Sequence, residues 1–243
     1  MSLSPDEAKA LATSVKTLQK QGPKIATEMY DKFYAANPEL TSYFSICFLG
    51  KDHKAGEGAK ITLMAKVMAH ILFQFILNIE REEQFKADLE KIAAKHVSRM
   101  IKPEFFPLLR EALCTAVSDA LGDKATPECM AGWRKGYDKM AGILIQMQVD
   151  MEADLKKKPN TWEGFRKFKL VAPIEATTET IGQSSSGSSD SSEDEGTGFE
   201  EKVYKMILTP VDAGALPEVD KFGQYVALRL TVDGKVTHRN YNI

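Results

Sequence analysis

Residues 82–99 read EEQFKADLEKIAAKHVSR, and this stretch decides the fold of the N-terminal part of the chain. Its apolar residues Phe85, Leu89 and Ile92 recur at steps of four and three, the spacing of the buried stripe of an amphipathic helix. The next step of four reaches His96, so an imidazole occupies a position where a core residue is expected. A buried imidazole must be hydrogen-bonded, charged beside a partner, or bound to a metal. These three explanations predict different functions.

Composition and charge exclude several classes of protein. The 243 residues carry a formal net charge of −2, which gives no electrostatic reason to expect nucleic acid or an anionic membrane as a partner. The most apolar run, Ile71–Ile79, is too short to span a bilayer, and the N-terminus has no signal-peptide pattern. Three cysteines without a Cys-x-x-Cys pair predict neither a disulfide framework nor a zinc site. These features favour a reducing, cytoplasmic setting.

Helical patterns follow one another from residue 4 to about residue 157, without a strand pattern between them. The run Ser4-Pro5-Asp6-Glu7 predicts a capping box with proline in the first helical turn, and Gly22-Pro23 is expected to close that helix. Further helices are expected over residues 25–36, 40–44, 59–79, 82–99, 103–121 and 126–155. We therefore predict an all-α domain over residues 1–157.

Short segments rich in β-branched and aromatic residues follow Lys156-Lys157-Lys158-Pro159. Asp233-Gly234 is expected to join the last two strands as a two-residue hairpin turn. Residues 182–198 are rich in Ser, Gly, Asp and Glu, and we expect them to be a disordered spacer rather than a phosphorylated segment. Because about four strands do not close a barrel, we predict an incomplete all-β unit over residues 158–243. The strands are expected over residues 165–171, 202–209, 224–232 and 235–241.

Several segments resemble one family, the flavohemoglobins, in which a globin is fused to a ferredoxin-reductase-like flavin and nicotinamide module. In the helical part the resemblance lies in FYAANPEL (33–40), KHVS (95–98), IKPE (101–104) and LGD (121–123), with Trp133 and Tyr137. The junction WEGFRKF (162–168) is similar to the family's linker. LTPVDAG (208–214), FGQY (222–225) and RNYN (239–242) are similar to the opening of its flavin barrel. The order and spacing of these segments carry the resemblance.

The resemblance implies a globin heme domain over residues 1–157 and the N-terminal part of an FAD-binding barrel over residues 158–243. It implies heme b, FAD in the complete architecture, dioxygen and nitric oxide as ligands, and NAD(P)H or a separate reductase as electron source. The implied activity is conversion of nitric oxide and dioxygen to nitrate. The family's remaining barrel strands and nicotinamide-binding domain have no counterpart in the sequence. We therefore expect the N-terminal part of a longer protein or a truncated gene product.

On the heme, the resemblance assigns His96 as the proximal iron ligand. Tyr30 matches the tyrosine that donates a hydrogen bond to the heme ligand, and a phenol is a suitable neutral donor for an apolar pocket. Phe44 matches the phenylalanine that packs on the heme face. From the residues alone, Tyr30 could instead be a core aromatic whose hydroxyl reaches the surface.

The distal helix departs from the family pattern, which has a glutamine followed by a leucine one turn later. Counting back from Asn78 places Met64 and Met68 at these positions, and a shift by one residue gives Leu63 and Val67. The register leaves His53, Lys54 or His70 as residues that could still reach the pocket. We expect an apolar distal wall with Tyr30 as the main donor.

The proximal side departs from the pattern as well. The family supports its histidine with a tyrosine ten residues later and a glutamate in the last helix. This chain has Phe106 at the first position and Gln148 at the second, with Glu152 one turn further along the helix. An amide can accept the imidazole N–H but lacks the carboxylate charge that makes the ligand more basic. Weaker oxygen activation is the hypothesis that follows.

In the second unit, Tyr225 and the run Arg239-Asn240-Tyr241-Asn242 match the family's flavin-contacting segments. Arginine suits the flavin phosphate through its planar donor fork, and tyrosine suits the isoalloxazine ring by stacking. Two other functions remain open besides the dioxygenase. One is a non-enzymatic globin that binds or senses oxygen, and the other is a helical interaction domain without a cofactor.

Overall fold

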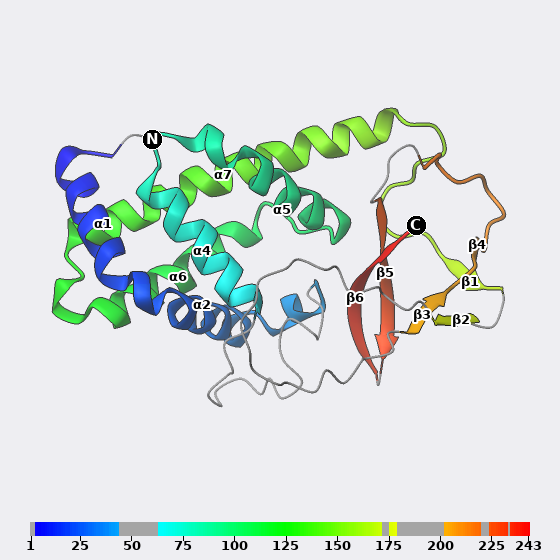
Figure 1. Cartoon of the computed structure of the whole chain (residues 1–243), viewed down its shortest axis with the longest axis horizontal. Coiled ribbons are helices and arrows are strands. Elements are labelled where there is room, and N and C mark those ends of the chain that lie inside the picture. Colours follow the sequence, from blue (N-terminus) through cyan, green and yellow to red (C-terminus); the bar gives the residue numbers. More distant parts are fainter. Residues whose placement is uncertain (1–2, 44–62, 172–174, 179–201, 220–223, 233) are drawn as a thin grey trace, which may run out of the picture. The chain divides into compact units, whose positions relative to one another are not determined.

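A computed structural model describes residues 3–43, 63–171, 175–178, 202–219, 224–232 and 234–243 (Figure 1). The chain divides into two compact units. The first comprises residues 1–159 together with 218–243, and the second comprises residues 160–217. The predicted insertion at residues 182–198 lies outside the described residues, as does Phe44.

The first unit is built on α-helices, as the sequence predicts. Short 3₁₀ turns connect several of them: η1 (Gln19–Gln21), η2 (Pro38–Tyr43), η3 (Glu82–Phe85) and η4 (Gly122–Lys124). The helices are α1 (Pro5–Leu18), α2 (Gly22–Ala36), α4 (Leu63–Leu77), α5 (Lys86–Ser98), α6 (Phe105–Leu121) and α7 (Pro127–Lys157).

Local sequence signals account for most helix boundaries. Ser4 and Glu7 form the predicted capping box, in which the Ser4 hydroxyl accepts from the Glu7 N–H and the Glu7 carboxylate accepts from the Ser4 N–H. Gly122 ends α6 with a φ of 56°, a conformation that costs glycine little. The expectation that Gly22-Pro23 closes the first helix is wrong. The pair opens α2 instead, because proline is tolerated in a first helical turn, where its missing N–H needs no partner.

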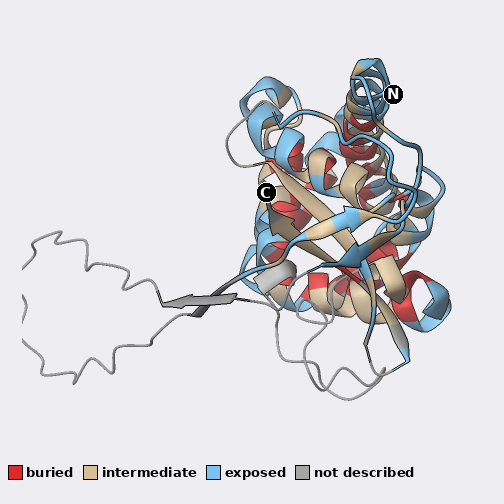
Figure 2. Ribbon diagram, turned by 90° about the vertical axis from the view of Figure 1, so that its right-hand side faces the viewer, coloured by how far each residue is buried: buried red, intermediate tan, exposed pale blue. Residues whose placement is uncertain are grey.

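The core lies where α1, α2, α4, α6 and α7 pack together, and the buried residues line the inner faces of these helices (Figure 2). Trp133 of α7 is fully buried, and its indole N–H donates to the hydroxyl of Ser14 on α1 at 2.9 Å. Burial of a side chain of this size contributes about 3 kcal/mol or more, and the hydrogen bond satisfies its polar edge. Helix α5, which carries His96, packs against α7.

The strands form antiparallel pairs, and the predicted class of a helical domain followed by an incomplete β region is confirmed. The predicted hairpin is also confirmed, since Val232 pairs with Lys235 and Gly234 adopts a φ of 74°. The strand expected over residues 202–209 is in fact two strands with different partners, and β2 was not predicted. The pairs are β1 (Phe168–Leu170) with β4 (Leu208–Pro210), β2 (Glu175–Thr178) with β3 (Lys202–Lys205), and β5 (Tyr225–Val232) with β6 (Lys235–Asn242).

The contacts of the β5–β6 hairpin group it with the helices, while β1 to β4 belong to the second unit. Within the described ranges, none of the helices combines the length and the apolar character needed to cross a bilayer.

Candidate functional site

His96 occupies the buried stripe of α5, as the sequence predicts. Leu89 and Ala93 on the preceding turns are buried, and His96 continues their face as a half-buried residue whose Nδ1 is fully buried. Burial lowers the pKa of its imidazole to about 4, because the charged form loses its hydration. The ring is therefore neutral at physiological pH. A neutral imidazole held through one nitrogen can offer the lone pair of the other to a metal.

Gln148 of α7 supplies the polar neighbour of this ring. Its side chain is buried, and its Nε2 donates to the carbonyl of Ile101 at 2.9 Å. Its amide also acts on His96 as a side-chain hydrogen-bonding group that raises the imidazole pKa, opposing the larger effect of burial. Within the described residues, Nδ1 of His96 and Oε1 of Gln148 are both buried without a hydrogen bond of normal geometry. A hydrogen bond from the Nδ1 N–H of His96 to Oε1 of Gln148 would satisfy both atoms.

Aromatic side chains from the start of α6 surround the same imidazole. Phe106, ten residues after His96, lies edge-on to the His96 ring with centroids 5.7 Å apart. Its neighbour Phe105 lies edge-on to Tyr43 at the end of η2, with centroids 5.1 Å apart. Phe106 has no hydroxyl, so Gln148 is left as the polar support of His96. Glu152, the alternative from the sequence, is exposed.

On α2, Tyr30 is a half-buried aromatic residue packed against the core. Its ring stacks on Tyr34 one turn later, with centroids 6.0 Å apart and an interplanar angle of 15°. Burial raises the pKa of the Tyr30 phenol well above its usual value, so the group stays a neutral donor.

The described part of α4 partly resolves the question of register. Met68 is half-buried and packs against the core, whereas Val67 and His70 are exposed. The exposure of Val67 and His70 argues against the alternative register and against His70 as a pocket residue. The side chains of Leu63 and Met64 lie outside the described residues, as do His53 and Lys54.

The surroundings of His96 suit a metal ion that is already coordinated by a macrocycle. In the described part of the chain, no group of three or more His, Cys, Asp or Glu residues could hold a bare metal ion. A single neutral imidazole, flanked by the Phe106 ring and the Gln148 amide, suits heme iron, because the porphyrin provides four nitrogens. With Nδ1 buried beside the Gln148 amide, Nε2 is the nitrogen that would ligate the iron. The residues present therefore fit heme.

The β6 strand brings the predicted flavin-contacting residues to the first unit. Arg239, Asn240 and Tyr241 are half-buried, and Asn240 donates through Nδ2 to the Ser98 hydroxyl at 3.5 Å. Tyr225 of β5 interacts electrostatically with Arg99, raising the pKa of the guanidinium against the stronger effect of burial. The side chain of Asn242 is outside the described residues.

Comparisons with known proteins find similarity to globins and to flavohemoproteins. A sequence model of the globin family matches residues 27–144. A flavohemoprotein of Oceanobacillus iheyensis is 31% identical over 169 residues, covering 70% of this chain and 39% of the relative. One from Deinococcus radiodurans is 26% identical over 233 residues, covering 96% of this chain and 49% of the relative.

Flavohemoproteins are thus the proteins that the chain resembles over most of its length, and residues 27–144 match the globin family. A structure of flavohemoglobin from Malassezia yamatoensis with bound FAD and heme superimposes with a TM-score of 0.70 at 21% identity, covering 99% of this chain and 54% of that one, which shows the shared fold. The chain spans about half the length of most of the curated relatives it matches.

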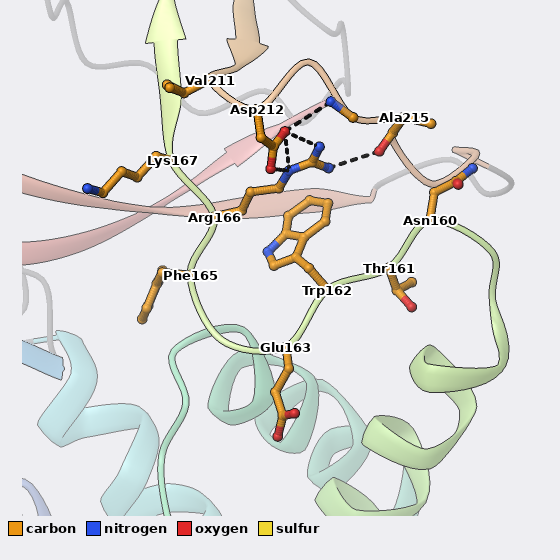
Figure 3. A pocket seen from close by; sticks show the side chains of 11 residues that line it. Asn160, Thr161, Trp162, Glu163, Phe165, Arg166, Lys167, Val211, Asp212 and Ala215 are labelled. Carbon is orange, nitrogen blue, oxygen red and sulfur yellow. Dashed lines mark hydrogen bonds and ion pairs between the residues drawn. The ribbon is translucent and has the colours of Figure 1, made fainter.

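The second unit of the chain holds a surface hollow that the sequence did not predict. It lies between the linker residues 160–167 and the β4 turn at residues 211–215 (Figure 3). Arg166 spans it, with Nε donating to the Asp212 carboxylate at 2.9 Å and Nη1 to the Ala215 carbonyl at 2.9 Å. Its guanidinium also lies 5.3 Å from the centre of the Trp162 ring. These contacts hold the Arg166 guanidinium between the two segments, which makes the hollow a structural junction.

His238 of β6 is the second feature that sequence reasoning missed. This residue is only 3% exposed. Side chains on a strand alternate between two faces, and His238 lies on the buried one. A lone histidine in a polar stretch carries no signal in the sequence, because its burial depends on a tertiary contact with η2.

Proposed function

We propose that this chain carries the heme-dependent part of a nitric oxide dioxygenase, which converts nitric oxide and dioxygen to nitrate. The observation that supports the proposal most directly is His96, a neutral imidazole held on one edge in a globin fold. Similarity to flavohemoproteins suggests the reaction class. When bound, heme would provide a redox-active iron at which nitric oxide, dioxygen and one electron combine to give nitrate.

Different side chains would bind the iron, donate to its ligand and exclude water. His96 would hold the iron through Nε2, while Oε1 of Gln148 would accept a hydrogen bond from the Nδ1 N–H and so fix the tautomer. On the opposite side, the Tyr30 phenol would donate a hydrogen bond to the ligand, and its raised pKa keeps that proton in place. Met68 would contribute to an apolar wall that limits access of water. Phe44, which matches the family's heme-packing phenylalanine, and Met64, which stands where the family has a glutamine, would complete this wall.

Electrons would come from NAD(P)H through FAD. Tyr225 and residues 239–242 would contact the flavin, with Arg239 suited to its phosphate and Tyr241 to its ring. The nicotinamide step would be performed by further sequence of the same protein or by a separate reductase, because this chain spans about half of its relatives.

A second function, reversible oxygen binding or sensing, is favoured by one observation. The histidine is supported by a neutral amide and an aromatic edge, from Gln148 and Phe106, where the family resemblance implies a carboxylate and a phenol. A neutral partner leaves the imidazole less basic, and a less basic ligand pushes less electron density to the iron.

The 243-residue chain, supplied with heme, tests the proposal in two stages. Wild-type protein should show a Soret band with histidine ligation, and His96→Gly should lose it and regain it with added imidazole. His70→Ala, which removes an exposed histidine from α4, is the matched control and should bind heme normally. Nitrate formation from nitric oxide and dioxygen with an added electron source then separates the dioxygenase from the oxygen-binding protein. Absence of heme binding in the wild type would contradict both.

A further inference from the structure

The β5–β6 hairpin contacts the helices of the first unit through one face of β6. Side chains on a strand alternate between two faces, so His238 and Asn240 share one face, and Arg239 and Tyr241 share the other. The buried residue among them is His238, and the hydrogen bond of Asn240 to Ser98 lies on the same side. The face that holds the hairpin in place is therefore distinct from the face that carries Arg239 and Tyr241, whereas Asn240, which also belongs to the predicted flavin segment, lies on the docking face.

His238 fits into the end of η2. Its Nδ1 is in hydrogen-bonding contact with the Ser42 carbonyl, which requires the proton on that nitrogen. Its ring stacks on Tyr43, with centroids 5.9 Å apart and an interplanar angle of 21°. A buried polar contact combined with ring stacking defines both the position and the register of β6 on this surface.

Two series of contacts run from the hairpin toward the histidine of the heme site. Tyr43, under His238, lies against Phe105, whose chain neighbour Phe106 lies against His96. Asn240 reaches Ser98, two residues after His96 in the chain. The hairpin thus contacts segments that lead directly to the proximal side of the site.

We propose that His238 is a positioning residue that fixes β6 on the heme unit, so that Arg239 and Tyr241 present the flavin beside the site of His96. This inference rests on the proposed function, because it assumes heme at His96 and flavin at β6. It adds a residue that the family motif does not contain and separates the docking face of the strand from its cofactor face.

The first measurement is hydrogen exchange on the full chain. His238→Ala removes both contacts, whereas His238→Phe keeps a ring for Tyr43 and loses the donor to Ser42. We expect exchange of backbone amides in residues 38–43 and 235–242 to rise at least tenfold in the alanine variant and less in the phenylalanine variant. His70→Ala should leave both segments unchanged. Unchanged exchange in His238→Ala would overturn the proposal.

The second measurement separates positioning from a purely structural role. Photoreduced FAD, which carries two electrons, can reduce two ferric hemes to the ferrous state, and the initial rate is read at the Soret band under anaerobic conditions. We expect the rate to fall at least fivefold in His238→Ala while the Soret spectrum of the ferric protein stays that of the wild type. Equal rates in the two proteins would overturn the positioning role, even if hydrogen exchange changes. If the wild type binds no heme, the proposed function fails, and the exchange data still decide whether His238 holds the hairpin.

Discussion

The amide nitrogen of Gln148 donates to the carbonyl of Ile101 at 2.9 Å, and this contact determines which end of the amide faces His96. The N–H of Ile101 in turn donates to the His96 carbonyl at 3.0 Å, so both residues are tied to the segment that follows the histidine. Because one N–H of the amide is committed to Ile101, Oε1 is the acceptor that Gln148 can offer to the imidazole N–H. An amide oxygen accepts this hydrogen bond without a full negative charge, which orients the ring but leaves it neutral.

Gln148→Glu should therefore make the proximal ligand more basic. A buried carboxylate beside Nδ1 gives the imidazole more anionic character and stabilises the ferric state. We expect the iron–histidine stretching frequency of the ferrous protein to rise and the heme midpoint potential to become more negative. Resonance Raman spectroscopy and spectroelectrochemistry measure the two quantities.

The control for this substitution is Gln148→Leu, which keeps the volume and removes both polar atoms. It leaves the Ile101 carbonyl and His96 Nδ1 without a polar neighbour, at a cost of about 1 to 3 kcal/mol in the free energy of unfolding. A midpoint potential that is the same in Gln148→Glu and Gln148→Leu would show that this side chain does not act on the imidazole.

Much of this arrangement can be predicted from local sequence patterns. The stripe of Phe85, Leu89 and Ile92 leads to His96 because helical periodicity is a property of neighbouring residues, and the capping box at Ser4 is equally local. Gly22-Pro23 misleads because the pair can end one helix or open the next, and only the packing of α2 decides between them.

The features that the sequence did not predict depend on contacts between distant residues. His238 is buried by η2, and the Ser14 hydroxyl is paired with Trp133, which lies far away in the chain. The strand expected over residues 202–209 is divided because β3 and β4 have different partners, β2 and β1. Strand propensity depends on the residue types in a segment, and it does not indicate which other strand the segment will pair with.

Tyr30→Phe removes the proposed distal donor. One hydrogen bond to a ligand in an apolar pocket contributes about 1.5 kcal/mol, so we expect the dissociation rate of dioxygen from the ferrous protein to rise about tenfold. Flash photolysis or stopped-flow mixing measures this rate. Tyr34→Phe, one turn further along α2, is the matched control and should change the rate by much less. Equal effects of the two substitutions would contradict the distal role of Tyr30.

The crossing of α1 and α7 depends on Gly132. A Cβ at this position would lie 3.0 Å from the Cβ of Leu11 and 3.1 Å from the carbonyl oxygen of Glu7, both closer than normal packing allows. We therefore expect Gly132→Ala to lower the free energy of unfolding by about 1 to 3 kcal/mol, because the two helices must separate.

Gly142 in the same helix provides the control for this prediction. It is exposed, and a Cβ there would meet nothing within 4 Å, so Gly142→Ala should stabilise the protein by about 1 kcal/mol through helix propensity alone. Urea denaturation followed by circular dichroism measures both variants. Equal effects at the two positions would show that helix propensity, rather than packing against α1, governs Gly132.

The ion pair of Arg166 and Asp212 gives the second unit a dependence on pH. The guanidinium, together with the Gly214 N–H, lowers the pKa of the Asp212 carboxyl from 3.8 to about 2. Since the folded state binds this proton less readily than the unfolded state, the stabilisation is complete above pH 3.8 and is lost as the pH falls toward 2.

Arg166→Gln removes the cation and keeps a polar side chain of similar length. We expect the pKa of Asp212 to return toward 3.8, as measured by nuclear magnetic resonance titration of its carboxyl carbon. Asp154, whose pKa is lowered by Lys157 on α7, is an internal reference and should not change. If the Asp212 pKa stayed near 2 in the variant, the Gly214 N–H would be its main support, and the guanidinium would serve mainly to cover Trp162 and to bind the Ala215 carbonyl.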